Sequence, residues 1–83
     1  MLTVTVISPE AVLFEGTTDS IVVPAYDGEL GILTGHAPMM TLLGKGTLRV
    51  GGAGSERRFV IEGGFLQVVD NQVRVVTEHA SAA

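Results

Sequence analysis

Cysteine and tryptophan are absent from this 83-residue sequence, and aromatic residues make up only 5% of it. Without cysteine, the fold has no disulfide bonds and no thiolate metal site to stabilise it. No run of about 18 apolar residues occurs, so the sequence predicts no membrane-spanning helix. Hydrophobic residues still account for 46% of the chain. The length therefore predicts one small domain with a single thin core.

Basic residues are also scarce. Five Lys and Arg stand against nine Asp and Glu, and residues 1–44 contain five of the acids and no Lys or Arg. An acidic chain with few aromatic residues lacks the basic patch and the stacking side chains of nucleic-acid-binding proteins. It also lacks the Lys/Arg clusters that bind anionic lipid. The sequence thus predicts no nucleic-acid partner and no direct insertion into lipid.

Glycine and proline are closely spaced and exclude long helices. Eleven Gly and three Pro leave only one stretch longer than eight residues that is free of both, 65–83. Apolar and polar residues alternate with a period of two, as in 2–6, which indicates strands. We expect an all-β chain, a small antiparallel β-sandwich or flattened barrel of about ten short strands.

Turn residues divide the sequence into segments. The expected strands are 2–6, 12–15, 19–25, 30–33, 47–50, 57–62, 65–69 and 72–77. Gly16 is expected to end the second of them, Asp27-Gly28 to form a turn, Gly31 to interrupt 30–33, and 51–55 to be a polar hairpin loop. Residues 1–78 are assigned to the sandwich domain and 79–83 to a disordered tail.

The segment 35–43 fits neither a solvated loop nor a central strand. Pro38 excludes a central strand. Four apolar residues are too many for a solvated loop: Met39, Met40, Leu42 and Leu43. Two interpretations stay open, because the segment either forms a contact surface or folds back over one end of the sandwich.

Catalytic and metal-binding patterns are missing. A metal site needs three or more ligands, whereas His36 and His79 lie 43 positions apart. Neither a Gly-x-Ser-x-Gly elbow nor a complete phosphate-binding loop occurs, and a glycine-flanked turn explains the GKGT at 44–47. Asp27 and Glu29 are interpreted as solvated acids, and His36 as a residue that orders its loop. We expect no enzyme active site, no metal site and no cofactor.

Lys45 supports one alternative function. Lipoyl and biotinyl carrier domains are also small acidic β-sandwiches, and they carry one modified lysine on a hairpin. Lys45 is the only lysine of this chain, but glycines flank it where the carriers have Met, Asp or Ala. A carrier domain modified on Lys45 is therefore the second hypothesis.

Three segments carry a resemblance to a known family. They are VVPAYDGELGILTGHAPM at 22–39, IEGGFLQV at 61–68 followed by Asn71, Val73 and Val75, and the opening LTVTVISPE with FEG at 14–16. In this order they resemble the epsilon subunit of bacterial F-type ATP synthases over the whole chain. The resemblance implies a ten-stranded β-sandwich without catalytic residues.

The resemblance also implies a role and partners. The family's sandwich belongs to the central stalk, or rotor, where it binds the gamma subunit and the c-ring and couples proton flow to ATP synthesis. This location is the cytoplasmic face of the bacterial inner membrane, reached peripherally through the complex. Carried over to this sequence, the c-ring and gamma contacts are expected at one end of the sandwich: Glu29, Leu30, Gly31, Ile32, His36, Ala37, Pro38, Met39 and Met40. Glu29 is expected to meet an arginine of the c-ring.

Family members continue beyond the sandwich into a two-helix domain that inhibits ATP hydrolysis and, in some members, binds nucleotide. Too few residues follow Thr77 here to form a helix pair. We therefore expect the C-terminal helical domain to be absent, and with it this inhibition and ATP binding.

Overall fold

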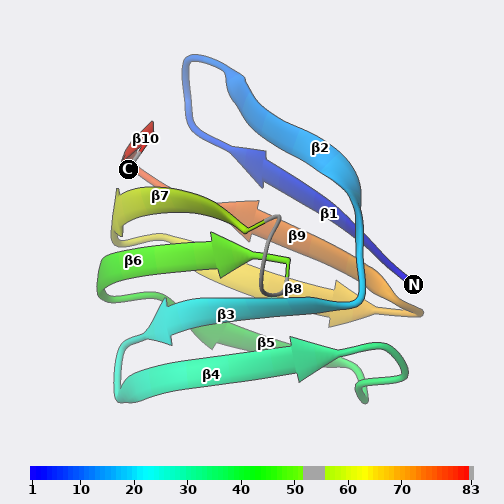
Figure 1. Cartoon of the computed structure of the whole chain (residues 1–83). Helices are drawn as coiled ribbons and strands as arrows, with labels where there is room; N and C mark the ends of the chain where they lie inside the picture. The colour runs from blue at the N-terminus through cyan, green and yellow to red at the C-terminus, as the bar shows by residue number, and fades with distance from the viewer. Residues whose placement is uncertain (52–55, 83) are drawn as a thin grey trace.

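The computed structural model, which describes residues 1–51 and 56–82, arranges strands in two five-stranded sheets packed face to face (Figure 1). The strand order is β2-β1-β9-β8-β5 in the first sheet and β10-β7-β6-β3-β4 in the second. None of the described residues forms a helix, so this part of the chain contains no helix able to cross a membrane. The prediction of an all-β sandwich of about ten short strands is confirmed.

The strands are short, with four to seven residues each. Their bounds are β1 (Leu2–Ile7), β2 (Val12–Thr18), β3 (Ser20–Ala25), β4 (Gly28–Leu33), β5 (Met39–Leu42), β6 (Lys45–Val50), β7 (Arg57–Glu62), β8 (Phe65–Val69), β9 (Gln72–Val76) and β10 (His79–Ala82).

The core lies between the sheets and follows from the alternation of side chains along each strand. In β1, Leu2, Val4 and Val6 are fully buried, as expected from their spacing. Burying a side chain of this size contributes about 1.5–3 kcal/mol. The same inward face on the other strands and on the β5–β6 connection supplies the rest of the core: Ile21, Val23, Ile32, Leu43, Leu48, Val50, Phe59, Ile61, Leu66, Val68, Val73 and Val75.

The pairing of β1 with β9 and the bridge between β3 and the end of β5 determine which strands lie inside the sheets and which lie at their edges. The first strand, β1, lies inside its sheet, antiparallel to β2 on one side and parallel to β9 on the other, with Thr3 opposite Gln72. β4 and β5 are the edge strands of their respective sheets, and an isolated bridge between Ala25 and Leu43 joins the two sheets next to them. One side of the sandwich therefore consists of β4, β5 and the loop 34–38 between them.

Gly64 occupies the turn that leads into β8, at a point where only glycine fits. Its φ is +108°, a region that L side chains rarely adopt. A Cβ on this residue would lie 1.9 Å from the carbonyl oxygen of Val76. The carbonyl of Gly64 accepts a hydrogen bond from the Leu43 amide at 2.9 Å. This bond joins the start of β8 to the residue that follows β5.

Glycines inside strands cause four differences from the expected boundaries. The turn expected at Asp27-Gly28 lies one residue earlier, at Tyr26-Asp27, because Gly28 is the first residue of β4 and pairs with Ala25. Gly16 does not end β2, because it pairs with Val4 of β1; the Phe14 ring covers it, with Cζ 3.1 Å from where its Cβ would be. Gly31 does not interrupt β4, where it pairs with Val22. Gly46 is the second residue of β6, which begins before the expected residue Thr47.

Two segments that were not expected to be strands contain one each: the apolar segment 35–43 and the tail 79–83. Residues 39–42 form β5, an edge strand that begins directly after Pro38. Pro38 therefore lies outside the strand, where its missing N–H costs no hydrogen bond between strands. Residues 79–82 are not disordered but form β10, which pairs antiparallel with β7. Residue 83 and residues 52–55 of the predicted hairpin loop lie outside the described part of the chain.

Candidate functional site

The nine residues predicted as contacts lie on the side of the sandwich made by β4, β5 and the loop 34–38, at the bottom of Figure 1. Glu29 to Ile32 belong to β4, and Met39 and Met40 begin β5. His36, Ala37 and Pro38 lie in the connecting loop. The structure thus gathers the set on one side, but it does not give every member the same access to solvent.

Glu29 is exposed and already has a cationic neighbour within the chain. Nη2 of Arg49 donates to its carboxylate, 3.3 Å from Oε2 and 3.4 Å from Oε1. Arg49 lies on β6, two strands away across β3, where it pairs with Val22. Since both groups are partly exposed, the pair contributes only about 0.2–1 kcal/mol. Glu29 is therefore free to exchange this partner for one on another subunit.

Ile32 and Leu30 face the core instead of solvent. Ile32 is fully buried opposite Ile21, and the half-buried Leu30 packs against the same cluster. Ile32 therefore anchors β4 and offers no surface to a partner. Gly31 is exposed, and nothing lies within 4 Å of where its Cβ would be.

The loop after β4 has a defined turn. Gly35 has φ +87°, and the amide of His36 donates to the carbonyl of Leu33 at 3.1 Å, as in a β-turn with glycine at its third position. Nδ1 of His36 lies 2.7 Å from the carbonyl oxygen of Ala37. This contact agrees with the loop-ordering role expected for His36. Ala37 and Pro38 are exposed.

The two predicted segments do not lie at one end of the sandwich. Glu29 is close to the β3–β4 turn, whereas His36 follows the opposite end of β4 (Figure 1). About 13 Å of extended strand separates Glu29 from Leu33 before the loop begins. Glu29 also belongs to the outer face of one sheet and Met40, opposite Gln67, to the outer face of the other. The structure therefore places the two segments at opposite ends of β4, and their contacts with gamma and the c-ring stay a prediction.

A further surface emerged only from the strand register. On the outer face of the first sheet, one apolar residue from each strand lies directly opposite the next across all five strands. These residues, called the apolar row below, are Leu42, Phe65, Val76, Ile7 and Val12. None of them is buried, and the two at the ends, Leu42 and Val12, are 64% and 61% exposed.

Polar side chains border the apolar row. The adjacent positions across the same strands are Gln67, Arg74, Thr5 and Glu15, with only Met40 on β5 continuing the apolar surface. Contiguous exposed apolar surface with a polar border is typical of protein–protein contacts. The apolar row cannot be found from the alternation within single strands, because each of its residues is simply one that faces outward. Only the pairing of the strands shows that the five residues are neighbours.

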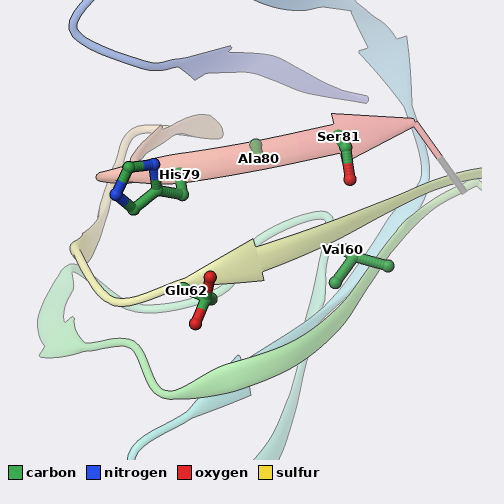
Figure 2. A pocket seen from close by; sticks show the side chains of 5 residues that line it. All are labelled: Val60, Glu62, His79, Ala80 and Ser81. Atoms are coloured by element: carbon green, nitrogen blue, oxygen red, sulfur yellow. The ribbon is translucent and has the colours of Figure 1, made fainter.

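Two titratable side chains, Glu62 and His79, line a hollow on the surface of the described part of the chain. A shallow hollow of about 320 Å³ lies on the outer face over β7 and β10, lined by Val60, Glu62, His79, Ala80 and Ser81 (Figure 2). Glu62 and His79 are opposite each other in the register, but Glu62 is paired with Lys45 at 3.7 Å. In residues 1–51 and 56–82, no group of three His, Cys, Asp or Glu side chains is placed to hold a metal ion.

Lys45 does not occupy the position that a carrier domain requires. Its side chain is 77% exposed, but it is the first residue of β6, in register with Glu62 of β7. A modified lysine on a carrier lies on a hairpin, where it reaches its partner enzymes. The structure gives the carrier hypothesis no support.

The whole sequence, residues 1–83, matches the family described as ATP synthase, Delta/Epsilon chain, beta-sandwich domain. It is 44% identical over 80 residues to the ATP synthase epsilon chain of Leptospira borgpetersenii serovar Hardjo-bovis, covering 96% of this chain and 63% of the relative. It is 39% identical over 79 residues to that of a Synechococcus strain, covering 95% and 58%. The chain thus spans about three fifths of the length of these relatives.

Solved structures agree with these sequence matches. A chain of the Euglena gracilis mitochondrial ATP synthase, solved with OSCP, F1 and the c-ring, superposes with a TM-score of 0.89 at 27% identity, covering 98% of this chain and 52% of the other. A chain of the Tetrahymena thermophila mitochondrial enzyme, from its central stalk and c-ring, superposes with a TM-score of 0.79 at 19% identity, covering 96% and 65%. The second comparison supports the fold alone.

Proposed function

The chain belongs to the family of ATP synthase delta/epsilon chains with a β-sandwich domain, and on this premise we propose that it is a non-catalytic central-stalk subunit of a proton-translocating F-type ATP synthase. In this role it links the gamma subunit to the c-ring, turns with both, and couples proton flow to ATP synthesis. It would be peripheral, at the cytoplasmic face of the bacterial inner membrane.

One observation carries this proposal: the match to the family extends over all 83 residues, with 44% identity to an ATP synthase epsilon chain. The structure adds two exposed surfaces of different character, which suit two different partners. The similarity to a chain in the Euglena assembly that contains F1 and the c-ring supports membership of such an assembly.

We assign the apolar row to gamma. Permanent interfaces are more hydrophobic than transient ones, and a rotor subunit held for many turns needs a permanent one. The row crosses the whole of the first sheet from Val12 on β2 to Leu42 on β5. Met40, with its flexible thioether side chain, extends it towards the loop 34–38 and adapts to an irregular partner surface.

We assign the acidic side at Glu29 to the c-ring. Its neighbours Asp27 and Gly31 are exposed, and the cation that it pairs with in the chain, Arg49, is held only by a partly exposed ion pair. The c-ring of this family presents polar loops with an arginine, which Glu29 matches in charge. Such a rim contact favours orientation more than affinity.

Binding to gamma tests the proposal directly. Purified chain mixed with the gamma subunit should elute as one complex in gel filtration, and membranes stripped of this subunit should rebind it. Elution of the two proteins separately at micromolar concentration, together with no rebinding, would overturn the central-stalk role. An unmodified intact mass is expected for the native protein, since a lipoyl or biotinyl group on Lys45 would favour the carrier hypothesis.

Glu29→Lys should weaken coupling while leaving the fold intact. The substitution places a second cation next to Arg49 and repels the cation expected on the c-ring. We expect ATP synthesis at a fixed proton gradient to fall about twofold to fivefold, the effect of roughly 0.4–1 kcal/mol. The melting temperature should fall by no more than about 8 °C.

The double substitution Glu29→Lys, Arg49→Glu is the matched control. It restores an ion pair within the chain but keeps the reversed charge at position 29. Recovery of the melting temperature without recovery of synthesis supports the contact at Glu29. Recovery of both would mean that position 29 acts only through its pair with Arg49.

A further inference from the structure

The β8–β9 turn makes an unexpected connection to the β4–β5 loop. Asn71 ends this turn, and its side-chain oxygen Oδ1 accepts a hydrogen bond from the amide of Gly35 at 2.7 Å, although the two residues lie 36 positions apart. The carbonyl of Asn71 also accepts from the amide of Thr3 at 2.8 Å. One residue thus joins the turn, the start of β1 and the loop 34–38, all at the right-hand end of Figure 1.

The loop has few other contacts to hold it. Within it, the Gly35 turn is closed by the bond from the His36 amide to Leu33, and Nδ1 of the His36 ring lies within hydrogen-bond distance of the carbonyl of its neighbour Ala37. Gly35 itself is exposed with φ +87°, and a glycine at this position permits many other conformations. Among the hydrogen bonds of the described residues, the one from the Gly35 amide to the Asn71 side chain joins this loop to a distant part of the fold.

We propose that Asn71 is a positioning residue for the subunit contact, because it holds the loop 34–38 in the conformation in which it meets the rotor. The inference rests on the proposed function and deepens it. A loop that is ordered before binding loses less conformational entropy on association, which strengthens binding without adding a contact. Asn71 itself is half-buried.

Asn71 also has a role in the β8–β9 turn itself, and a test of its effect on the loop must leave that turn intact. Asp70 and Asn71 have φ values of 50° and 61°, as in a type I′ hairpin turn. Asp-Gly is among the pairs that this turn favours, so Asn71→Gly keeps the turn and removes the side-chain acceptor. Asn71→Asp keeps an acceptor oxygen at the same place and tolerates the left-handed conformation.

Two measurements test the proposal. In the purified chain, Asn71→Gly should accelerate hydrogen exchange of the Gly35 amide about fivefold to tenfold, the effect of losing one hydrogen bond, while core amides such as that of Val73 exchange as before. In gel filtration or titration against a complex of gamma and c-ring, the same variant should bind about fivefold more weakly. Asn71→Asp should restore both values.

The outcomes separate this inference from the proposed function. If the wild-type chain does not bind the complex, the central-stalk role fails and the inference fails with it. If the wild type binds and Asn71→Gly binds equally well, the positioning role is overturned and the central-stalk role stands. If Asn71→Asp fails to restore binding although Gly35 is protected again, the effect does not pass through the loop and the inference is also overturned.

Discussion

Gly64→Ala is expected to destabilise the domain by at least about 4 kcal/mol, or to prevent folding altogether. The new Cβ would overlap the carbonyl oxygen of Val76, at 1.9 Å, and would lie 2.7 Å from Cα of Thr77. Both contacts are with backbone of the segment that leaves β9, so no side-chain rotation relieves them. The positive φ of +108° adds about 1–3 kcal/mol of strain.

This loss is large compared with the stability of so small a domain, which is about 4–12 kcal/mol on a per-residue basis. Urea unfolding followed by circular dichroism measures it. Gly63→Ala is the matched control, because Gly63 also has a positive φ, +69°, but its nearest neighbour would be Glu78 Cδ at 3.7 Å. It should cost only about 1–2 kcal/mol of strain. Equal losses for the two variants would show that the overlap at Gly64 has no effect.

Leu42→Ser should weaken binding to gamma about tenfold to thirtyfold without a comparable change in stability. Leu42 is at one end of the apolar row and 64% exposed, so the free domain loses little packing when it is truncated. A large apolar side chain that becomes buried at an interface contributes roughly 1.5–2 kcal/mol, which corresponds to this change in Kd. Isothermal titration against purified gamma measures the change.

Leu33→Ser provides a close control for this prediction. Leu33 is also 64% exposed and is also on an edge strand, but it lies on β4, in the other sheet and away from the apolar row. It should leave the affinity for gamma unchanged. A similar loss in both variants would mean that general surface hydrophobicity, and not the row, governs binding.

The fold was predictable from sequence wherever strand and turn signals are local. Leu2, Val4 and Val6 alternate with threonines, and this pattern alone assigns the buried face of β1. β10 has no such pattern, since HASA contains only small and polar residues. It forms because β7 offers it a free edge and because the buried Thr77 hydroxyl donates to the His79 carbonyl at 3.0 Å, where the chain enters β10. Neither cause is visible in a sequence window.

The candidate site was predictable only in part, for a related reason. The family motif indicates the region from Glu29 to Met40, but it does not separate the buried Ile32 from the exposed Glu29. Strand alternation makes that distinction once β4 is known to be continuous through Gly31. The pair of Glu29 with Arg49 and the alignment of the apolar row depend on which strands are neighbours. Which distant strands become neighbours depends on the topology of the sheets, and the residue pattern of a single strand does not specify that topology.

The parallel pairing of β1 with β9 determines when the first sheet can form, because β1 needs a partner that comes much later in the sequence. β1 is an interior strand of its sheet, and one of its two partners, β9 (Gln72–Val76), is far from it in the sequence. Until those residues emerge, β1 and β2 form a hairpin that carries an exposed edge and an uncovered apolar face. Contacts of such long sequence separation are slow to form. The first sheet is therefore complete only once residues 72–76 are available, and a chain halted before residue 72 would be prone to aggregate through the open edge of β1.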